Sequence, residues 1–272
     1  MKKFSIIHIP LLSFFSKELY RDVALNWKGV GAVLGYLLLL LAVCWIPTMI
    51  EMHIAFADFV DNEAPKVVEQ VPEITITDGQ VSIEQPQPYY IKDPDCNGVL
   101  AIIDTTATIT SLEDSNALCL LTKNSIIWQQ SEFETRTIDL SEVENFVLSS
   151  ERIMGWLHTA GKFLAIIIYP FALLGSYLYR IVQALIYAAI GLLFALYCKV
   201  TLSYAALLRL AVVAVTPCVI AKTVLGIAGV HLPYAPLIYL LAALAYLFFG
   251  VHAAAQTTAP PQETHFPPQI EI

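Results

Sequence analysis

The stretch GVGAVLGYLLLLLAVCWIPTMI, from Gly29 to Ile50, decides the class of fold. It holds no charged side chain in 22 residues, and as a helix rising 1.5 Å per residue it would be about 33 Å long. The hydrocarbon core of a bilayer is roughly 30 Å thick, so residues 29–50 are predicted to form the first transmembrane helix. A cleavable signal peptide is the competing interpretation, because Ala55-Phe56-Ala57 has the form of a cleavage site. We favour the uncleaved helix, because its apolar run is longer than that of a signal peptide.

The composition of the whole chain agrees with a membrane protein. Hydrophobic residues make up 57% of the 272 residues and charged residues only 14%, whereas soluble domains average about 25% charged residues. The net charge of -8 has the wrong sign for a protein that neutralises nucleic-acid phosphates, so nucleic acid is not an expected partner. The five cysteines lack the spacing of a zinc module or a disulfide scaffold.

Four more spans are predicted in a transmembrane bundle over residues 157–252. The windows are residues 160–179, 181–198, 204–225 and 234–251. The first two are separated only by Arg180, and one helix through both would be about twice as long as a bilayer needs. We therefore expect a tight hairpin between Gly175 and Arg180, which gives five spans in all. Four spans are the alternative if this turn is only a kink.

Orientation is predicted from the basic residues of short segments, which favour the cytoplasmic side. Residues 1–28 hold five of them and are expected to form a cytoplasmic amphipathic leader. The polar residues 51–156 are then outside, and five spans also place the Pro-rich tail, residues 253–272, outside. Lys199 and Arg209 fit this topology less well. The basic residues of the leader are Lys2, Lys3, Lys17, Arg21 and Lys28.

The apolar residues of the leader alternate with its basic ones, as in a helix that lies on the inner leaflet. A binding site for a partner protein is the alternative interpretation. The apolar residues concerned are Phe14, Phe15, Leu19, Tyr20, Val23 and Trp27.

The polar segment 51–156 is predicted to be an α+β domain on a stalk formed by residues 51–70. Its apolar residues fall in short alternating runs, and Asp78-Gly79 between two such runs predicts a β-hairpin. Further strands are predicted at VLAIID, ALCLL and SIIWQ, with a turn at Lys123-Asn124. Ser141 and Glu144 have the spacing of a capping box, which predicts that an amphipathic helix begins there.

One motif in this domain has the spacing of a calcium-binding loop. Oxygen-bearing residues stand at positions 1, 3, 5 and 12, with glycine at position 6, as in an EF-hand-type loop. A hairpin loop is the alternative, because aspartate, proline, asparagine and glycine also favour turns. The candidate calcium ligands are Asp93, Asp95, Asn97 and Asp104.

The same domain contains two cysteines, Cys96 and Cys119. An oxidising exterior would permit a disulfide between them, closing a loop worth about 3 kcal/mol in the chain-entropy model. Two free thiols are the alternative, and the sequence leaves both open.

The bundle carries no catalytic motif. No Asp or Glu occurs between Leu157 and Val251, although proton relays and metal sites within membranes depend heavily on carboxylates. Pro47, Pro170 and Pro217 interrupt three spans and predict kinks. Small residues four apart, such as Ala184 with Ala188, favour close helix packing within the chain over a dimer face.

Several strings of this sequence resemble a bacterial family of polytopic membrane proteins of unknown function. They are FFSKELYRDVALNWKGVG, LAIIDTT, LLTKNSIIW and LRLAVVAVTP, and the resemblance covers Phe15 to about Val251. Some members are labelled maltodextrin-utilisation proteins, and the membrane part is similar to the Yip-type superfamily. The resemblance implies the bacterial cytoplasmic membrane and a Yip-like bundle, and it transfers no catalytic residue. Where the family pattern has glycine after Asp104-Thr105-Thr106, this chain has Ala107, so that turn is expected to differ.

These observations together predict a non-enzymatic accessory, scaffold or regulatory protein, associated with sugar uptake through the resemblance alone. The expected partners are the lipid bilayer and other membrane or envelope proteins, and no cofactor is expected apart from calcium. A permease or substrate-translocating component is the alternative function, motivated by the kinked spans. A membrane enzyme ranks third.

Overall fold

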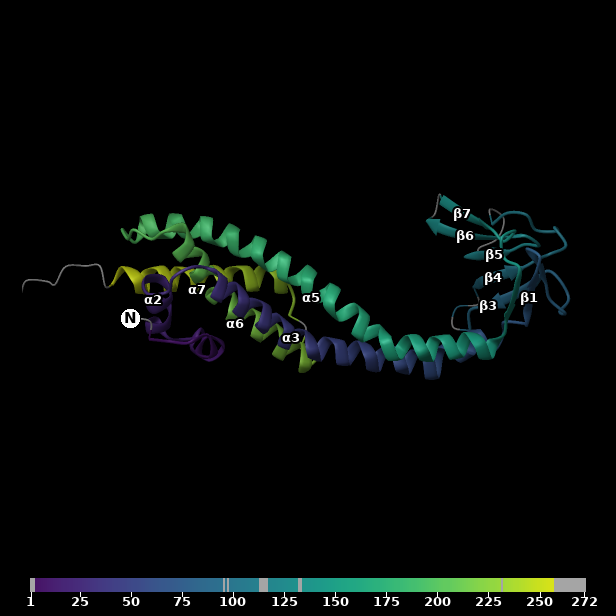
Figure 1. Ribbon diagram of the computed structural model, residues 1–272, viewed down its shortest axis with the longest axis horizontal. Coiled ribbons are helices and arrows are strands. Elements are labelled where there is room, and N and C mark those ends of the chain that lie inside the picture. Colours follow the sequence, from purple (N-terminus) through teal and green to yellow (C-terminus); the bar gives the residue numbers. More distant parts are fainter. Residues whose placement is uncertain are drawn as a thin grey trace, which may run out of the picture. The chain divides into compact units, whose positions relative to one another are not determined.

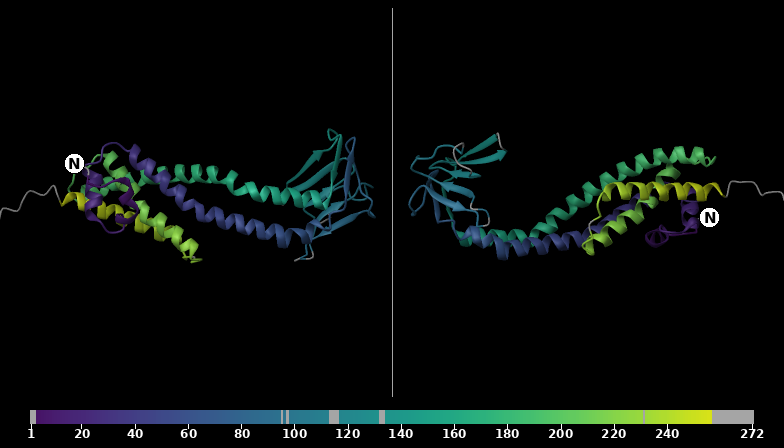
Figure 2. Two further views of the ribbon diagram at one scale, coloured as in Figure 1. Left: turned by 60° about the horizontal axis from the view of Figure 1, so that its bottom comes forward. Right: turned by 180° about the vertical axis from the view of Figure 1, so that it is seen from behind.

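The computed structural model (Figures 1 and 2) describes residues 3–94, 96, 98–112, 117–131, 134–230 and 232–256. The chain divides into two compact units. The helical unit comprises the residues up to Met49 and those from Ile168 on, and the β unit comprises Ile50–Ile167. Two long helices, α3 and α5, contribute residues to both units. The predicted combination of apolar helices with an α+β domain is confirmed.

Four helices among the described residues are long and apolar enough to cross a bilayer. They are α3 (Gly31–Asp58), α5 (Ser150–Tyr197), α6 (Tyr204–Ile227) and α7 (Ala235–Ala255). The helical path of α3 continues through the π-helical turn Phe59–Glu63 into α4 (Ala64–Val68). Each of α3, α5 and α6 contains one of the three prolines predicted to interrupt the spans.

The predicted hairpin between Gly175 and Arg180 is wrong, because α5 is one helix of 48 residues. Only Pro170 interrupts its hydrogen-bond pattern, and the residues after it, mainly Leu, Ala, Ile and Tyr, contain no further strong helix breaker. Arg180 does not end the helix, since its guanidinium donates to Gln183 on the same helix. The described chain therefore has four candidate spans and not five.

Close packing joins α5 to α6. The small residues Ala184, Ala188, Gly191 and Ala195 of α5 are buried. A Cβ added at Gly191 would lie 3.2 Å from the Cδ2 atom of Leu207 on α6. The prediction that the small residues four apart serve contacts within the chain is confirmed.

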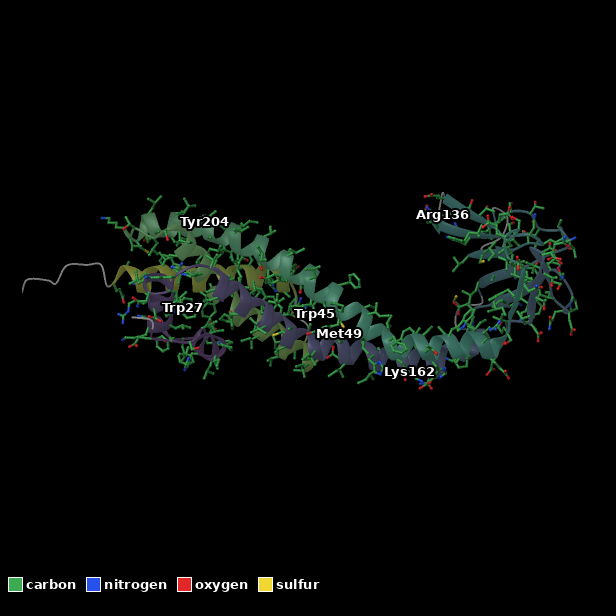
Figure 3. All side chains as sticks on the ribbon, viewed as in Figure 1. Trp27, Trp45, Met49, Arg136, Lys162 and Tyr204 are labelled. Atoms are coloured by element: carbon green, nitrogen blue, oxygen red, sulfur yellow. The ribbon has the colours of Figure 1, made fainter. Side chains whose placement is uncertain are left out.

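Two aromatic side chains join α3 to α5 through partly buried hydrogen bonds. The indole nitrogen of Trp45, marked in Figure 3, donates to the hydroxyl of Ser176 at 2.8 Å. The hydroxyl of Tyr169 donates to the carbonyl of Ala42 at 2.9 Å. Both residues thus satisfy their polar ends against the neighbouring helix while their rings fill the apolar interior.

The leader folds onto the bundle and is not a free helix. Its main element, α2 (Lys17–Leu25), starts where the Ser16 hydroxyl accepts from the Leu19 backbone N–H, which is an N-cap. Helix α2 contacts both α6 and α7. Leu19, Tyr20 and Val23, which the sequence assigned to lipid contact, are instead fully buried. The outward apolar surface belongs mainly to the preceding segment, at Ile7, Leu11 and Phe15.

Two charged side chains, Asp22 and Arg209, hold this arrangement together. Asp22 is 2% exposed and accepts hydrogen bonds from the backbone N–H groups of Lys3 and Phe4 and from the side chains of Asn26 and Trp27. Burial alone would raise the pKa of this carboxyl, but the four hydrogen bonds outweigh it, and the pKa lies below its ordinary value.

Arg209, on α6, supplies the second anchor and is 6% exposed. Its guanidinium donates to the carbonyl oxygens of Val23 at 3.1 Å, Ala24 at 3.2 Å and Gly29 at 3.5 Å. These carbonyls lie at and just beyond the C-terminal end of α2, where helical carbonyls lack partners within the helix and favour a cation.

The described end of the chain lies beside the leader. Tyr20 packs edge-on against Phe249 of α7, with ring centroids 5.5 Å apart, and a Cβ added at Gly250 would lie 2.6 Å from the Tyr20 ring. The sequence placed the leader and the residues after α7 on opposite sides of the membrane. That prediction depended on the hairpin that α5 does not form. The tail beyond Gln256 lies outside the described residues.

The β unit contains two sheets. One has the order β2-β1-β8, formed by β1 (Ile74–Thr77), β2 (Gln80–Ser82) and β8 (Asn145–Leu148). The other has the order β3-β4-β5-β6-β7, formed by β3 (Tyr89–Lys92), β4 (Val99–Ile103), β5 (Cys119–Leu121), β6 (Ser125–Ser131) and β7 (Glu134–Asp139). All pairs are antiparallel except β4 with β5. Buried residues of both sheets, including Ile76, Ile91 and Ile103, form a shared core.

The hairpin at Asp78-Gly79 is confirmed. Strands β1 and β2 pair with Thr77 opposite Gln80, and both turn residues have positive φ, 47° at Asp78 and 75° at Gly79. This pair of left-handed residues is the two-residue turn that Asp-Gly favours. The predicted strands at VLAIID, ALCLL and SIIWQ, and the turn at Lys123-Asn124, are also found.

The predicted helix start at Ser141 is wrong. Residues 141–144 form an irregular segment, and β8 follows directly. The carbonyls of Val143 and Glu144 accept the backbone N–H groups of Gly79 and Asp78, at 2.9 and 2.7 Å. These long-range bonds tie residues 143 and 144 to the hairpin turn, after a turn closed by the Val143 N–H to Leu140 carbonyl bond, so Ser141 and Glu144 do not form a helix cap.

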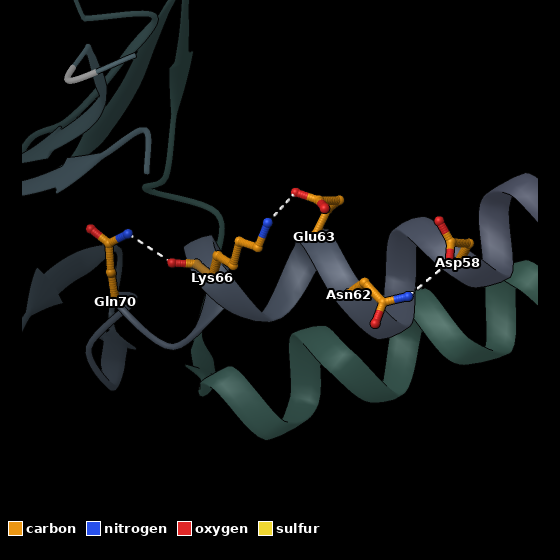
Figure 4. A network of polar contacts seen from close by, with 5 residues as sticks. All are labelled: Asp58, Asn62, Glu63, Lys66 and Gln70. Atoms are coloured by element: carbon orange, nitrogen blue, oxygen red, sulfur yellow. Dashed lines mark hydrogen bonds and ion pairs between the residues drawn. The ribbon is translucent and has the colours of Figure 1, made fainter. Parts of the chain in front are cut away.

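The stalk is helical through Val68. Figure 4 shows its polar surface, where Asn62 donates to Asp58, Lys66 pairs with Glu63, and Gln70 donates to the Lys66 carbonyl. Gln70 also joins the helix to the second sheet. Its amide donates to the carbonyl of Lys92 at 3.0 Å and accepts from the backbone N–H of Lys92 at 3.0 Å.

Candidate functional site

The structure separates the two predicted calcium ligands that it describes, Asp93 and Asp104. Asp93 follows β3, where Lys92 pairs with Val99, and Asp104 follows the opposite end of β4. The length of β4 separates the two residues, roughly 16 Å at 3.3 Å per residue. Asp95 and Asn97 lie outside the described residues. Within the described ranges, no three His, Cys, Asp or Glu side chains are grouped so that they could hold a metal.

Asp104 instead organises the loop that follows β4. Its buried carboxylate accepts from the backbone N–H and the hydroxyl of Thr106, at 2.9 and 2.6 Å, and from the backbone N–H of Ile109 at 2.5 Å. Burial by itself would raise the pKa of this carboxyl. The hydrogen bonds have the larger effect, so the pKa lies below its ordinary value. The side chain is therefore an ionised structural acceptor.

The same loop contains Ala107, at which the sequence departs from the family pattern. Ala107 has φ of 63°, in the left-handed region. Glycine adopts this conformation freely, whereas a residue with a Cβ pays roughly 1 kcal/mol. The turn thus has alanine at a position whose backbone conformation suits glycine.

Cys96 and Cys119 are both free thiols in the structure, Cys96 exposed and Cys119 half-buried in β5. The disulfide that the sequence left open is not formed here. Burial raises the pKa of the Cys119 thiol, which makes it a poor nucleophile at neutral pH.

A cavity in the β unit lies where β1 and β8 meet the start of α5. Its volume is about 480 Å³. Its walls are the neighbouring segments Thr75–Thr77 and Asn145–Val147, together with Arg152 and Trp156 of the first two turns of α5. Among the described residues, β8 is an edge strand of its sheet, and it borders this cavity.

Local bonds fix the start of α5 at the cavity. The Ser149 hydroxyl accepts from the backbone N–H of Arg152 at 3.3 Å, which caps the helix. The hydroxyl of Ser150 donates to the carbonyl of Val71 at 2.9 Å. The first turn is thereby held against the segment that leads into β1.

The cavity presents a cation and two aromatic rings in one stack. Phe146 and Trp156 lie 6.1 Å apart with an interplanar angle of 28°, and the guanidinium of Arg152 lies 5.7 Å from the centre of the Phe146 ring. Arg152 also donates to the carbonyl of Val147. Trp156 remains 52% exposed, so one face of the stack is open to a ligand.

The chemistry of the cavity suits binding. Thr75, Thr77 and Asn145 offer hydrogen bonds beside the aromatic surface, and the described lining contains no His, Cys, Asp or Glu. The sequence analysis missed this site. Strands β1 and β8 are about 70 residues apart in the sequence, and no local pattern predicts that they pair. A local indication was Trp156, one helical turn after Arg152 at the end of the polar segment.

The four long apolar helices and the separate β unit define an α-helical polytopic membrane protein that carries an α+β domain. The chain belongs to the family described as "Protein of unknown function (DUF1189)", whose model matches residues 11–251. The predicted membership of a family of unknown function is confirmed. No curated protein and no solved structure matches the chain.

Proposed function

We propose that this protein is a non-enzymatic accessory or scaffold protein of the bacterial cytoplasmic membrane, and that its β unit binds another envelope or transport component. The observation that carries the proposal is the cavity beside β8, which combines an open indole face, a guanidinium and an edge strand in which Arg152 binds the Val147 carbonyl. Such a surface suits an extended peptide segment, because a strand edge offers backbone hydrogen bonds and the cavity can take a side chain. A Yip-like bundle and a link to sugar uptake belong to this proposal through the sequence resemblance alone.

We expect the partner protein to co-purify less well when the cavity is altered. Trp156→Ala removes the open aromatic face, and in affinity purification of the full chain in mild detergent we expect recovery of the partner to fall about tenfold, since a central aromatic anchor contributes about 1.4 kcal/mol or more. Arg136→Gln is the matched control, because Arg136 lies on β7, in the other sheet (Figure 3). A clean monomer of the unaltered chain under several detergents and crosslinkers would contradict the proposal.

We also propose that both ends of the chain are cytoplasmic and that the β unit is extracytoplasmic. With α5 as one span, the turn that contains Lys199 falls on the side of Lys17, Lys28 and Arg209. The turn between α6 and α7, residues 228–234, contains no Lys or Arg. The short turns then agree with the positive-inside rule, and Lys222, near the far end of α6, is the exception.

Reporter fusions test this topology. A cytoplasmic reporter joined after residue 272 should be active, and one joined at Gly229, between α6 and α7, should be inactive. A fusion at Lys199 is the internal control and should behave like the C-terminal one. Activity confined to an exterior reporter at residue 272 would restore the five-span topology.

A permease or substrate-translocating component is the second candidate function. The observation that favours it is Arg180, a half-buried cation in the apolar part of α5. Uptake by the purified chain in proteoliposomes, assayed across a broad panel of solutes, distinguishes the two functions. Transport would favour the permease, and its absence the accessory role.

A further inference from the structure

The first part of the leader forms a loop that is fixed at both ends. The Asp22 carboxylate on α2 accepts hydrogen bonds from the backbone N–H groups of Lys3 and Phe4, at 3.0 and 3.1 Å. The hydroxyl of Tyr20, also on α2, donates to the carbonyl of Ser13 at 2.8 Å. The segment before α2 therefore holds a defined position against this helix, and we call it the leader loop.

One side of the leader loop packs against the protein and the other side is exposed. The loop contains α1 (Ile9–Leu12), which contacts α6. Ile9 is fully buried, whereas Ile7 and Leu11 are 84% and 69% exposed. Ile7 and Leu11 are four residues apart with Ile9 midway between them, so Ile9 takes the opposite side of this helical segment. Phe15, which is 64% exposed, extends the outward apolar side.

The leader lies close to one end of the candidate spans. Arg209, which binds the carbonyls of Val23 and of Gly29 at the start of the first charge-free run, is the sixth residue of α6. Gly250, against which Tyr20 packs, is the sixth residue from the end of α7. Each contact is therefore about 8 Å from the end of its helix. Interfacial helices bury their apolar side by roughly 5–10 Å between headgroups and acyl chains, which is a similar depth.

The polar surface of the described leader is mainly basic. Lys3, Lys17 and Lys28 are exposed, and Glu18 is its one exposed acidic side chain. The second acid, Asp22, is buried and accepts four hydrogen bonds. An apolar side flanked by basic residues matches a membrane surface, where acyl chains lie beneath negatively charged phosphates.

We infer that the leader loop is a lipid anchor, and that Ile7, Leu11 and Phe15 insert among the acyl chains of the leaflet on the side of the leader. The loop is attached to two candidate spans, α6 and α7 through α2, so lipid surrounds it at this depth. The docking of α2 selects these side chains, because it turns Leu19 and Val23 into the protein and leaves the loop to meet the lipid. This inference is independent of the proposed role of the β unit.

A fluorescent probe on the leader loop tests the inference. In the full chain, the five native cysteines are replaced by alanine and one NBD fluorophore is attached at Leu11→Cys or, as the matched control, at Glu18→Cys. The chain is reconstituted alone in vesicles of phosphatidylcholine with about one quarter phosphatidylglycerol, an anionic lipid. A pore-forming toxin admits dithionite, which bleaches NBD in water, to both sides.

The probe at Leu11→Cys should be bleached about tenfold more slowly than the probe at Glu18→Cys, because the acyl chains exclude dithionite. Nitroxide groups on the acyl chains should quench it roughly twice as strongly. Resistance to trypsin at Arg21 verifies that the leader is docked in each variant. Ile7→Cys repeats the measurement at an independent position if Leu11→Cys does not pass this control.

Two results would overturn the inference. Equal bleaching at the loop and control positions would mean that the loop faces water in a lipid membrane, and that its apolar side is reserved for a protein partner. Slow bleaching at Leu11→Cys without quenching by the nitroxide lipid would mean that a second copy of the chain, and not lipid, covers the loop.

Discussion

Gly79→Ala is expected to destabilise the β unit by about 3 kcal/mol or more, and to leave much of it unfolded at 37 °C. Gly79 has φ of 75°, which disfavours any residue with a Cβ. The added Cβ would lie 2.7 Å from the Cα of Ser141 and 3.0 Å from the carbonyl oxygen of Leu140. Both contacts are to backbone, so no side-chain rotation relieves them. The hydrogen bond from Gly79 to the Val143 carbonyl would be lost with them.

Pulse proteolysis of the full chain in detergent measures this effect through the fraction of the β unit that is cut. Gly155→Ala is the matched control, because an added Cβ there meets no atom within 4 Å and lies on α5. It should leave stability unchanged or raise it by about 1 kcal/mol through helix propensity. Equal resistance to the protease in the two variants would mean that the hairpin does not dock on residues 140–144.

Gly250→Ala is expected to release the leader from the bundle. The added Cβ would lie 2.6 Å from the Cδ1 atom of Tyr20, whose side chain is fully buried and whose hydroxyl donates to the Ser13 carbonyl at 2.8 Å. The ring therefore has no free space to rotate into, and α2 must move away from α7. Loss of this contact should cost about 2 kcal/mol, which corresponds to a rise of roughly 30-fold in the undocked population.

Trypsin cleavage at Arg21 reports that population, because a protease needs α2 to unfold or undock. An N-terminal tag makes the cut fragment visible, and cleavage in Gly250→Ala should be at least tenfold faster than in the unaltered chain. Gly226→Ala, on α6, is the control, since nothing lies within 4 Å of its added Cβ. If both variants are cut at the same rate, Tyr20 does not anchor the leader.

Local patterns in the sequence predicted the elements that local physics determines. The charge-free run from Gly29 is long enough by itself to predict a membrane span. The Asp78-Gly79 turn follows from the left-handed backbone conformation that these two residues readily adopt. Long-range contacts decided the rest. Glu144 has capping-box spacing, but its carbonyl bonds the hairpin turn about 65 residues earlier. The local pattern placed Arg180 at the end of a hairpin, because it is a charged residue between two apolar windows. The structure places it within the continuous helix α5.

The candidate sites show the same limit. The calcium spacing counted residues along the chain, whereas strand β4 carries Asp104 to the far end from Asp93. The cavity is built from β1, β8 and α5, whose meeting requires the whole β unit to fold. The leader was correctly identified as amphipathic, but its apolar side chains belong partly to the protein interior, where Asp22 and Arg209 fix them.

The bonds between Arg209 and the leader also set an order of events during synthesis. The guanidinium binds carbonyls 180 to 186 residues earlier in the chain. Tyr20 packs against Gly250, which is translated later than Arg209. The leader therefore leaves the ribosome first and docks last. Throughout elongation its buried face, including Leu19 and Val23, is available to the insertion machinery or to a chaperone. Docking requires that α7 has been made, so an open leader distinguishes a nascent chain that still lacks α7.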